Sequence, residues 1–136
     1  MYDDGEDPVR FPFSLLSSSL MDVSADFFLE NLQHVFLEPA LPNGTLAVHG
    51  THVEPRAIMR TALMTVEAEK DDIAAPGQTR TAQALCSSIP EHLRQHLLVL
   101  SAGHFSLFHG STCRARVLPA VVAFMARAEG DQTKVR

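Results

Sequence analysis

Residues 62–73 read ALMTVEAEKDDI, a short apolar run that ends abruptly in carboxylates. A second apolar run, residues 97–100 (LLVL), leads in the same way into SAGH, which ends at His104. Unbroken apolar runs of this length are typical of parallel strands that are covered on both faces. The two runs therefore predict two buried strands, one followed by an acidic loop and the other by a histidine.

The segment between the two runs predicts how the strands are connected. The first strand is expected over residues 62–66, Pro76 and Gly77 precede a helical pattern over residues 78–86, and the second strand is expected over residues 96–100. The order strand, helix, strand, helix predicts a right-handed βαβ crossover with parallel strands. Adjacent strands lie about 4.8 Å apart, so the loops after them meet at one sheet edge. Open α/β sheets bind ligands at that edge.

Helices and a hairpin are predicted on either side of this unit. One helix begins after Ser24, a favourable N-cap, and ends before Pro39. Residues 45–53 are rich in β-branched and small residues and predict a short hairpin. A final helix over residues 112–128 contains Pro119, which predicts either a kink or a later start with the proline in the first turn.

Length, composition and charge limit the class of protein. With 136 residues, 46% of them hydrophobic, the chain has the material of one domain. We divide it into an irregular lead-in (1–20), a domain (21–128) and a polar tail (129–136). The net charge of -5 and the 11 scattered Lys and Arg residues argue against a nucleic-acid surface. No apolar run reaches the roughly 20 residues of a membrane span, and the acidic start is unlike a signal peptide. These features predict a cytoplasmic protein.

A carboxylate and an imidazole that meet at a sheet edge have a definite chemistry. Asp71 lies in the first loop and His104 in the second. An imidazole acts as a general base when a carboxylate holds one ring nitrogen and leaves the other free to accept a proton. In hydrolases of this kind the chain order is nucleophile, acid, histidine. Asp71 and His104 follow the last two steps of that order and are predicted to be a catalytic pair.

Several sequence blocks in order suggest a specific family. The blocks are Met21-Asp22, Phe27-Phe28-Leu29-Glu30, residues 40–45 (ALPNGT), residues 61–73, Gly77-Gln78-Thr79, Leu85-Cys86, Ile89-Pro90 and Gly103-His104. Together they span about Leu20 to Phe124. This region resembles the C-terminal domain of intracellular poly(3-hydroxybutyrate) depolymerases, also called polyhydroxyalkanoate depolymerases.

The resemblance implies the C-terminal part of an α/β-hydrolase fold, with an incomplete sheet of parallel strands, flanking helices and a small helix and hairpin insertion. It also implies a Cys-Asp-His triad that hydrolyses polyester ester bonds. Asp71 matches the triad acid, being fourth in the glycine-x-x-aspartate pattern after the strand, and His104 matches the histidine. Asp72 adjoins the acid. Ala68 stands where that pattern has glycine, and Phe105-Ser106 replace the usual tyrosine-glycine.

The nucleophile that this triad requires is not recognisable in the chain. No Gly-x-Ser-x-Gly elbow or cysteine equivalent occurs, and Cys86 and Cys113 both follow the acid. Their spacing indicates neither a zinc site nor a disulfide, and we interpret them as reduced, partly buried thiols. We expect a polyester or hydroxybutyrate oligomer to be a substrate only together with the missing N-terminal half.

Three hypotheses remain open. The chain is the C-terminal part of a polyester depolymerase that supplies Asp71 and His104 to a nucleophile elsewhere, a non-catalytic remnant or interaction module, or a fragment of another esterase of the same fold. A half-sheet leaves an unpaired edge, so we expect the isolated chain to be marginally stable, homo-oligomeric or dependent on a partner. The aromatic helix, residues 27–36, is either a core helix or a lid over a polyester pocket. Association with storage granules is left open.

Neither a cofactor nor a metal is expected. Residues 49–52 (HGTH) offer two histidines, and His92 and His96 lie one turn apart if that stretch is helical. Neither group supplies a third ligand, so both are interpreted as surface histidines. The adjacent pair Asp71-Asp72 could form a paired-carboxylate site, but it is interpreted as a solvated acidic turn, with Asp71 preferred to Asp72 as the residue that matches the triad acid.

Overall fold

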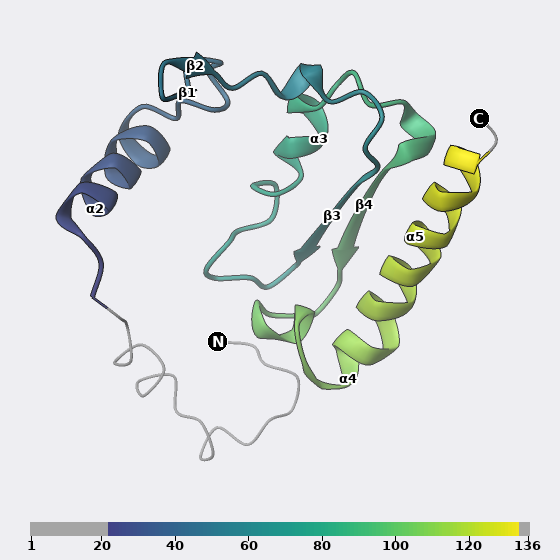
Figure 1. The fold of residues 1–136 in the computed structure, drawn as a ribbon. Coiled ribbons are helices and arrows are strands. Elements are labelled where there is room, and N and C mark those ends of the chain that lie inside the picture. The colour runs from purple at the N-terminus through teal and green to yellow at the C-terminus, as the bar shows by residue number, and fades with distance from the viewer. Residues whose placement is uncertain (1–21, 134–136) are drawn as a thin grey trace, which may run out of the picture. The chain divides into compact units, whose positions relative to one another are not determined.

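The computed structural model describes residues 22–133, which belong to two compact units, residues 22–55 and residues 56–133 (Figure 1). The predicted lead-in, residues 1–20, lies outside the described residues. Each unit contains helical segments and one two-stranded sheet. This mixed content agrees with the predicted α/β class, and the small parallel sheet agrees with the expectation of an incomplete one.

The first unit begins with a capped helix. Helix α2 (Ala25–Asn31) continues into a π-helical turn, η1 (Leu32–Leu37). The Ser24 side chain accepts a hydrogen bond of 3.2 Å from the Phe27 backbone N–H, so the predicted N-cap is confirmed. The helix also ends before Pro39, as predicted. None of the residues in α2 and η1 is buried, so the interpretation as a core helix finds no support here.

The predicted hairpin is also present in this unit. Strands β1 (Ala47–Val48) and β2 (Thr51–His52) pair antiparallel. The two residues between them, His49 and Gly50, have φ angles of 49° and 76°. Two positive φ angles are what a tight two-residue hairpin turn of the primed type requires, and glycine adopts this conformation without steric cost.

Two parallel strands are at the centre of the second unit. Strand β3 (Leu63–Ala68) pairs with β4 (Arg94–Val99) in a register that runs from Leu63 opposite Arg94 to Ala68 opposite Val99. The predicted parallel pairing is confirmed. Strand β3 extends beyond the predicted 62–66 and takes in Glu67, because the ladder with β4 continues past the apolar run. Strand β4 begins and ends slightly earlier than the predicted 96–100.

The connection between the strands contains the short helix α3 (Thr81–Leu85), which begins later than the predicted residue 78. A turn occupies the residues before it, in which the Gln78 N–H donates to the Ala75 carbonyl at 3.2 Å. Gly77 has a φ of 101°. Glycine adopts this left-handed conformation without steric cost, and the turn that continues to Arg80 delays the helix to Thr81.

The C-terminal helix places Pro119 in the first turn of its last segment, which begins at Leu118, as one of the two predicted forms requires. It consists of α4 (Gly110–Thr112), a π-helical stretch η5 (Cys113–Val117) and α5 (Leu118–Thr133). Proline lacks an N–H, and its ring crowds the carbonyl four residues earlier. The wider π stretch directly before Pro119 loosens the helix at that point, so the helix passes through the proline.

Helix α5 also runs beyond the predicted end at residue 128. The predicted polar tail, residues 129–136, is helical as far as Thr133, and the last three residues are not described. Gly130 does not end the helix, because one glycine costs only about 1 kcal/mol relative to alanine in a helix interior. The helix therefore extends into the segment that the sequence assigned to the polar tail.

Two apolar clusters hold the second unit together. One joins the strands to the C-terminal helix and consists of Ala68, Val99, Ala102, Cys113 and Val117. The other lies between the start of β3 and the end of α3 and consists of Cys86, Ile89 and Leu93. Each cluster contains one of the two cysteines, and both thiols are free and buried. The strand pair is less buried than its apolar character predicts, because Val99 is the one buried residue of β4 and Leu98 is exposed.

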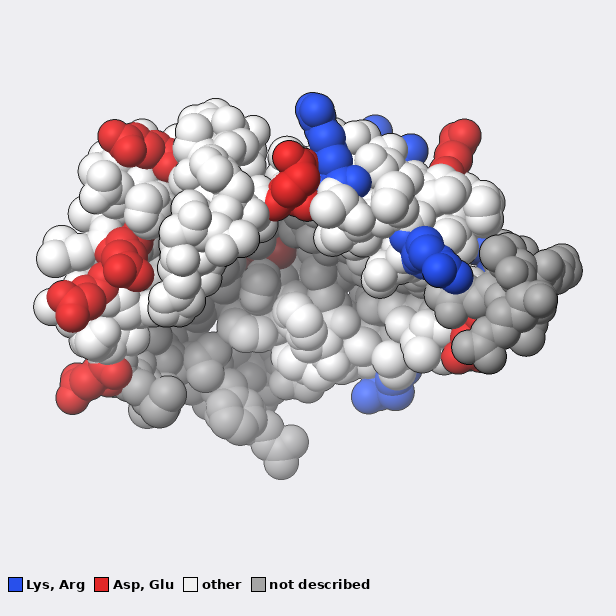
Figure 2. Space-filling view, turned by 45° about the horizontal axis from the view of Figure 1, so that its top comes forward, with Lys and Arg blue, Asp and Glu red and all other residues white. Residues whose placement is uncertain are grey.

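The surface carries scattered charges. On the face that Figure 2 shows, Lys and Arg side chains are separated by neutral residues and form no continuous basic patch. Within residues 22–133, none of the helices combines the length and the apolar content that a membrane crossing needs.

The buried cluster around Ile89 allows a test of the core. Ile89 is 2% exposed, whereas Ile73 is 53% exposed. We expect Ile89→Ala to lower the free energy of unfolding by about 2–5 kcal/mol, since it leaves a cavity. Ile73→Ala should change it by less than about 0.5 kcal/mol. Urea denaturation of the two variants measures both values, and equal losses would contradict this packing.

Candidate active site

The site begins with Asp71, which follows the end of β3. The strand pairing continues past β3, because the Glu69 N–H donates to the Val99 carbonyl at 3.0 Å and the Lys70 N–H donates to the Ala102 carbonyl at 2.9 Å. The chain then turns away from the sheet. Only 3% of the Asp71 side chain is exposed, so its carboxylate is fixed in a buried position at the carboxyl edge of the strand pair.

The Asp71 carboxylate has partners on both oxygens. Its Oδ1 accepts the backbone N–H groups of Ile73 at 2.9 Å and Ala74 at 2.7 Å. Its Oδ2 lies 2.9 Å from His104 Nδ1. Aspartate often accepts from its own backbone two or three residues on, and here that local turn aims the second oxygen at the histidine.

His104 reaches this position through the loop after β4. Ser101 turns the chain with a φ of 60°, and its N–H donates to Glu69 Oε2 at 2.8 Å. Glu69 thereby ties the histidine loop to the acid loop. His104 lies directly before a single 3-10 turn, η4 (Phe105–Leu107). Its side chain is 24% exposed, so the ring is accessible although one nitrogen is engaged.

The pairing determines the histidine tautomer. An ionised carboxylate only accepts hydrogen bonds, so the proton between the two groups is on His104 Nδ1. In the neutral ring Nε2 is then an acceptor, and no residue within 22–133 is hydrogen-bonded to it. An imidazole in this state is arranged to take a proton from a nucleophile.

The pKa of Asp71 reflects the same contacts. Burial raises the pKa of this carboxyl, but the N–H of Ala74, the His104 side chain and the N–H of Ile73 together outweigh burial and hold the pKa below its ordinary value of 3.8. Asp71 is therefore ionised at neutral pH, as a group that stabilises an imidazolium must be.

Two aromatic rings lie next to the histidine. The Phe105 ring meets the His104 ring edge-on, with centroids 5.3 Å apart. The Phe108 ring is tilted, with its centroid at 5.5 Å, and Phe108 is 68% exposed. The two rings supply apolar surface beside the imidazole. These two phenylalanines were not predicted from the sequence as site residues, although Phe105 was noted as a departure from the family pattern.

The structure distinguishes the two neighbouring aspartates. Asp71 is buried and contacts His104, whereas Asp72 is exposed. The expected contact between Asp71 and His104 is present, and their catalytic role stays a prediction. The alternative of a paired-carboxylate site gains no support, since the two side chains differ so strongly in exposure.

The histidines that were considered as metal ligands are not brought into a cluster. His96 is in strand β4 and His92 in a short 3-10 turn, η3 (Glu91–Leu93), so the helical spacing considered for them does not exist. Strand pairing with β3 determines this conformation. Across the described part of the chain, no group of three or more His, Cys, Asp or Glu residues is arranged to hold a metal ion.

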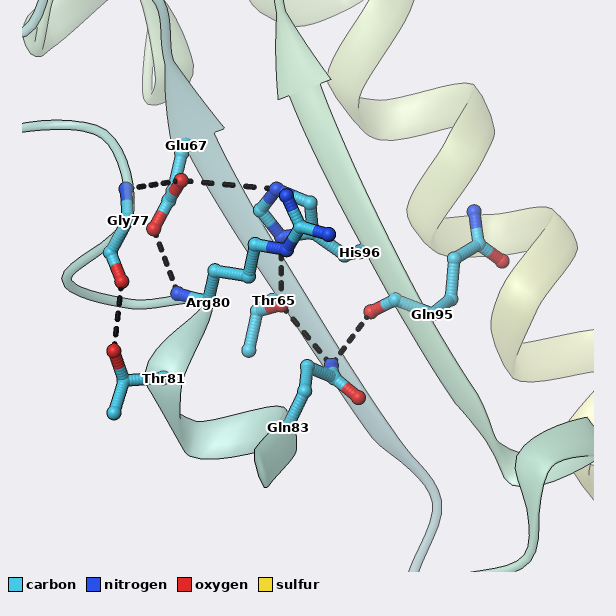
Figure 3. Close-up of polar contacts among 8 residues, drawn as sticks. All are labelled: Thr65, Glu67, Gly77, Arg80, Thr81, Gln83, Gln95 and His96. Atoms are coloured by element: carbon cyan, nitrogen blue, oxygen red, sulfur yellow. Dashed lines mark hydrogen bonds and ion pairs between the residues drawn. The ribbon is translucent and has the colours of Figure 1, made fainter. Parts of the chain in front are cut away.

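The sequence interpretation missed a second acid and histidine close by. Glu67 in β3 and His96 in β4 face each other, with Oε2 and Nε2 3.7 Å apart (Figure 3). Glu67 was assigned to the acidic loop, but it lies within β3. The signal that could have found it is the period of two in a strand, which places Glu67 on the same face as Thr65.

A family model described as PHB de-polymerase C-terminus matches residues 12–129 of the chain. The chain belongs to this family. The match confirms the resemblance found in the sequence and extends it at both ends. No curated protein and no solved structure matches the chain.

The PHB de-polymerase C-terminus match includes the whole of the strand pair and the loops that follow it. Asp71 and His104 are both within the matched residues, as are Glu67 and His96. The strand pair and the residues at its edge therefore lie within the part of the chain that matches the family.

The lowered pKa of Asp71 predicts a pH dependence of stability. A carboxyl whose folded-state pKa lies below its unfolded value stabilises the fold fully above the unfolded value, and this contribution is lost as the pH falls through the folded value. We expect the difference in free energy of unfolding between the wild type and Asp71→Asn to shrink as the pH falls from neutral to below 3.8.

Urea denaturation at a series of pH values measures this difference, with Asp72→Asn as the matched control. The exposed Asp72 carboxylate lacks these partners, so its stability curve should run parallel to that of the wild type. An Asp71→Asn curve that is also parallel to the wild type would contradict the stabilising contact.

Proposed function

We propose that this chain is the C-terminal part of a polyhydroxybutyrate depolymerase with an α/β-hydrolase fold, in which Asp71 and His104 are the acid and the histidine of a Cys-Asp-His triad. The observation that carries the proposal is the 2.9 Å contact between Asp71 Oδ2 and His104 Nδ1, which leaves Nε2 without a hydrogen-bond partner among residues 22–133, on a side chain that is 24% exposed. Membership of the family supports an ester bond of a hydroxybutyrate polymer as the target.

The proposed reaction uses His104 twice as a proton carrier. The cysteine thiol gives its proton to Nε2 while its sulfur forms a bond to the ester carbonyl carbon. The bond from this carbon to the alcohol oxygen then breaks, and the imidazolium returns the proton to the departing alcohol. In the second half a water gives a proton to Nε2, its oxygen attacks the thioester, and the carbon–sulfur bond breaks as the sulfur regains the proton.

Asp71 keeps the ring in the required state throughout this cycle. Its carboxylate holds the proton on Nδ1 and stabilises the positive charge that appears on the ring when Nε2 is protonated. The backbone N–H groups of Ile73 and Ala74 fix the other carboxylate oxygen. Because the acid is held from both sides, it orients the imidazole instead of merely lying near it.

The two cysteines of the chain are unsuited to be the nucleophile. Cys86 is buried with Ile89 and Leu93, and Cys113 is buried with Ala68 and Val99. A catalytic thiol needs access to substrate and a partly exposed, electropositive setting. We infer that the nucleophile lies on another segment or on another chain, at a distance that His104 Nε2 reaches.

The strand pair supports this arrangement. Among the described residues β3 and β4 pair only with each other, whereas parallel sheets normally have more strands, because both faces and the edges must be covered. A nucleophile elbow that belongs to an adjoining strand would end at the same carboxyl edge as Asp71 and His104. The apolar rings of Phe105 and Phe108 would then face an apolar polyester chain.

Reconstitution tests the proposed function. We expect the chain, joined to an upstream half of a family member that carries a cysteine elbow, to release hydroxybutyrate from oligomers. His104→Gln and Asp71→Asn should each lower turnover by about 10²–10⁴-fold, since proton transfer by a positioned base contributes that much. Product release measured by chromatography reports the rate.

Asp72→Asn is the control, because it removes a charge one residue from the acid and should retain activity. Activity in the reconstituted enzyme that survives both His104→Gln and Asp71→Asn would show that these residues are not catalytic. Full assembly with no turnover, despite an intact nucleophile, would favour the non-catalytic alternative. Cleavage of short chromogenic esters without cleavage of hydroxybutyrate oligomers would favour another esterase.

The chain without a nucleophile segment provides a separate prediction. We expect it to hydrolyse neither hydroxybutyrate oligomers nor chromogenic esters, because proton transfer to Nε2 has no thiol to start from. Turnover by the purified chain that His104→Ala abolishes would contradict this. A colorimetric ester assay at high protein concentration, with His104→Ala in parallel, measures it.

A further inference from the structure

A second polar cluster lies on the face of the sheet that α3 covers, opposite the face that packs on the C-terminal helix (Figure 3). Glu67 is its centre and is 3% exposed. One carboxylate oxygen accepts the Gly77 N–H at 2.8 Å, and the other accepts the Arg80 N–H at 2.6 Å. A buried carboxylate is costly unless it is hydrogen-bonded in this way.

His96 completes the surroundings of Glu67. Gln83 Nε2 donates to Thr65 Oγ1 at 3.0 Å and to the Gln95 carbonyl at 2.9 Å. The Thr65 hydroxyl therefore has its own proton free for His96 Nδ1, which lies 3.0 Å away. The proton of a neutral His96 is then on Nε2 and points toward Glu67.

The order hydroxyl, imidazole, carboxylate resembles a catalytic triad, but the cluster is not arranged for catalysis. Thr65 is 4% exposed, and its oxygen is already engaged by both Gln83 and His96. No substrate carbonyl can approach a hydroxyl that is enclosed between a strand and a helix. The function of the cluster must lie in what the Glu67 carboxylate holds, which is the loop that contains Asp71.

This loop, residues 69–80, has two ends that are fixed in different ways. Its start is fixed by strand-type hydrogen bonds of Glu69 and Lys70 to the β4 side. Its end is fixed by the two bonds from Gly77 and Arg80 to Glu67. Of residues 72–80, all but Ala74 are exposed. Apolar packing therefore contributes little, and the Glu67 bonds decide where the end of the loop lies.

Consecutive turns connect the Glu67 contacts to Asp71. The acid accepts from Ile73 and Ala74, the Ala75 carbonyl accepts from Gln78, and the Gly77 carbonyl accepts from Thr81. A shift at Gly77 would therefore be passed back along hydrogen-bonded turns to the carboxylate that contacts His104.

We propose that Glu67 is a positioning residue for Asp71, holding residues 77–80 so that the Asp71 carboxylate stays on His104. The inference rests on the proposed role of Asp71 and His104. The pKa of Glu67 is consistent with a carboxylate that stays ionised while it accepts these N–H groups. Burial raises it, but the N–H groups of Gly77 and Arg80, the charge of His96 and the N–H of Thr79 outweigh burial and hold the pKa below its ordinary value of 4.5.

Proton NMR of the full chain tests the proposal through the His104 Nδ1 proton, whose resonance is strongly deshielded when a carboxylate accepts it. Glu67→Gln keeps the side-chain shape but has only one oxygen for the two N–H groups and no charge. We expect the resonance in the wild type, its loss in Asp71→Asn, and its loss or severe weakening in folded Glu67→Gln. Asp72→Asn, which removes a carboxylate from the same loop, should retain it.

A second pair of variants leaves the buried carboxylate untouched. Arg80 is exposed and has a φ of -56°, which proline adopts readily at a helix start. Arg80→Pro removes the N–H that Glu67 accepts together with the side chain, and Arg80→Ala removes the side chain alone. We expect Arg80→Pro to weaken the resonance and Arg80→Ala to preserve it. This comparison stands even if Glu67→Gln does not fold.

The outcomes separate the two proposals. A resonance that persists in Asp71→Asn would overturn the assignment of Asp71 as the partner of His104. If the resonance is lost in Asp71→Asn but fully retained in folded Glu67→Gln and in Arg80→Pro, only the role of Glu67 is overturned. A purely structural role predicts lower stability with an unchanged resonance in the folded protein, whereas positioning predicts that the Asp71 pKa, read by carbon NMR, also rises toward 3.8.

Discussion

The parallel pairing of β3 with β4 is the constraint on which the second unit depends. The register places Ala68 opposite Val99, and two further bonds continue the ladder to Lys70. Both strands therefore end at the same edge, and the loops after them start side by side. Without this pairing, the acid and the histidine would be two unrelated loop residues. With it, Asp71 Oδ2 and His104 Nδ1 are 2.9 Å apart.

The end of β3 carries three carboxylates that have different partners. Glu67 accepts N–H groups from the end of the acid loop, Glu69 accepts the Ser101 N–H of the histidine loop, and Asp71 contacts His104. The first of them is buried on the α3 face and the second is exposed. A stretch that looks like a solvated acidic turn is in fact a set of separate contacts, each of which fixes a different part of the two loops.

The apolar contacts and the polar contacts have separate tasks in this unit. The cluster around Val99 and Val117 attaches the C-terminal helix to one face of the strand pair. The other face combines the small cluster around Ile89 with the hydrogen bonds of Glu67. Apolar burial supplies most of the stability, while directional bonds determine where the loops lie. A site that needs an accurately placed carboxylate depends on the directional hydrogen bonds.

The sequence by itself determined the strand order, the parallel pairing, the Ser24 cap, the hairpin and the family, because these follow from local patterns and from blocks of residues in order. It also singled out Asp71 and His104. Only the tertiary structure decided that Glu67 lies inside β3, that His96 faces Glu67, and that a π stretch precedes Pro119 in the last helix. These features depend on ladder register and on packing between distant segments, which no local window of sequence contains.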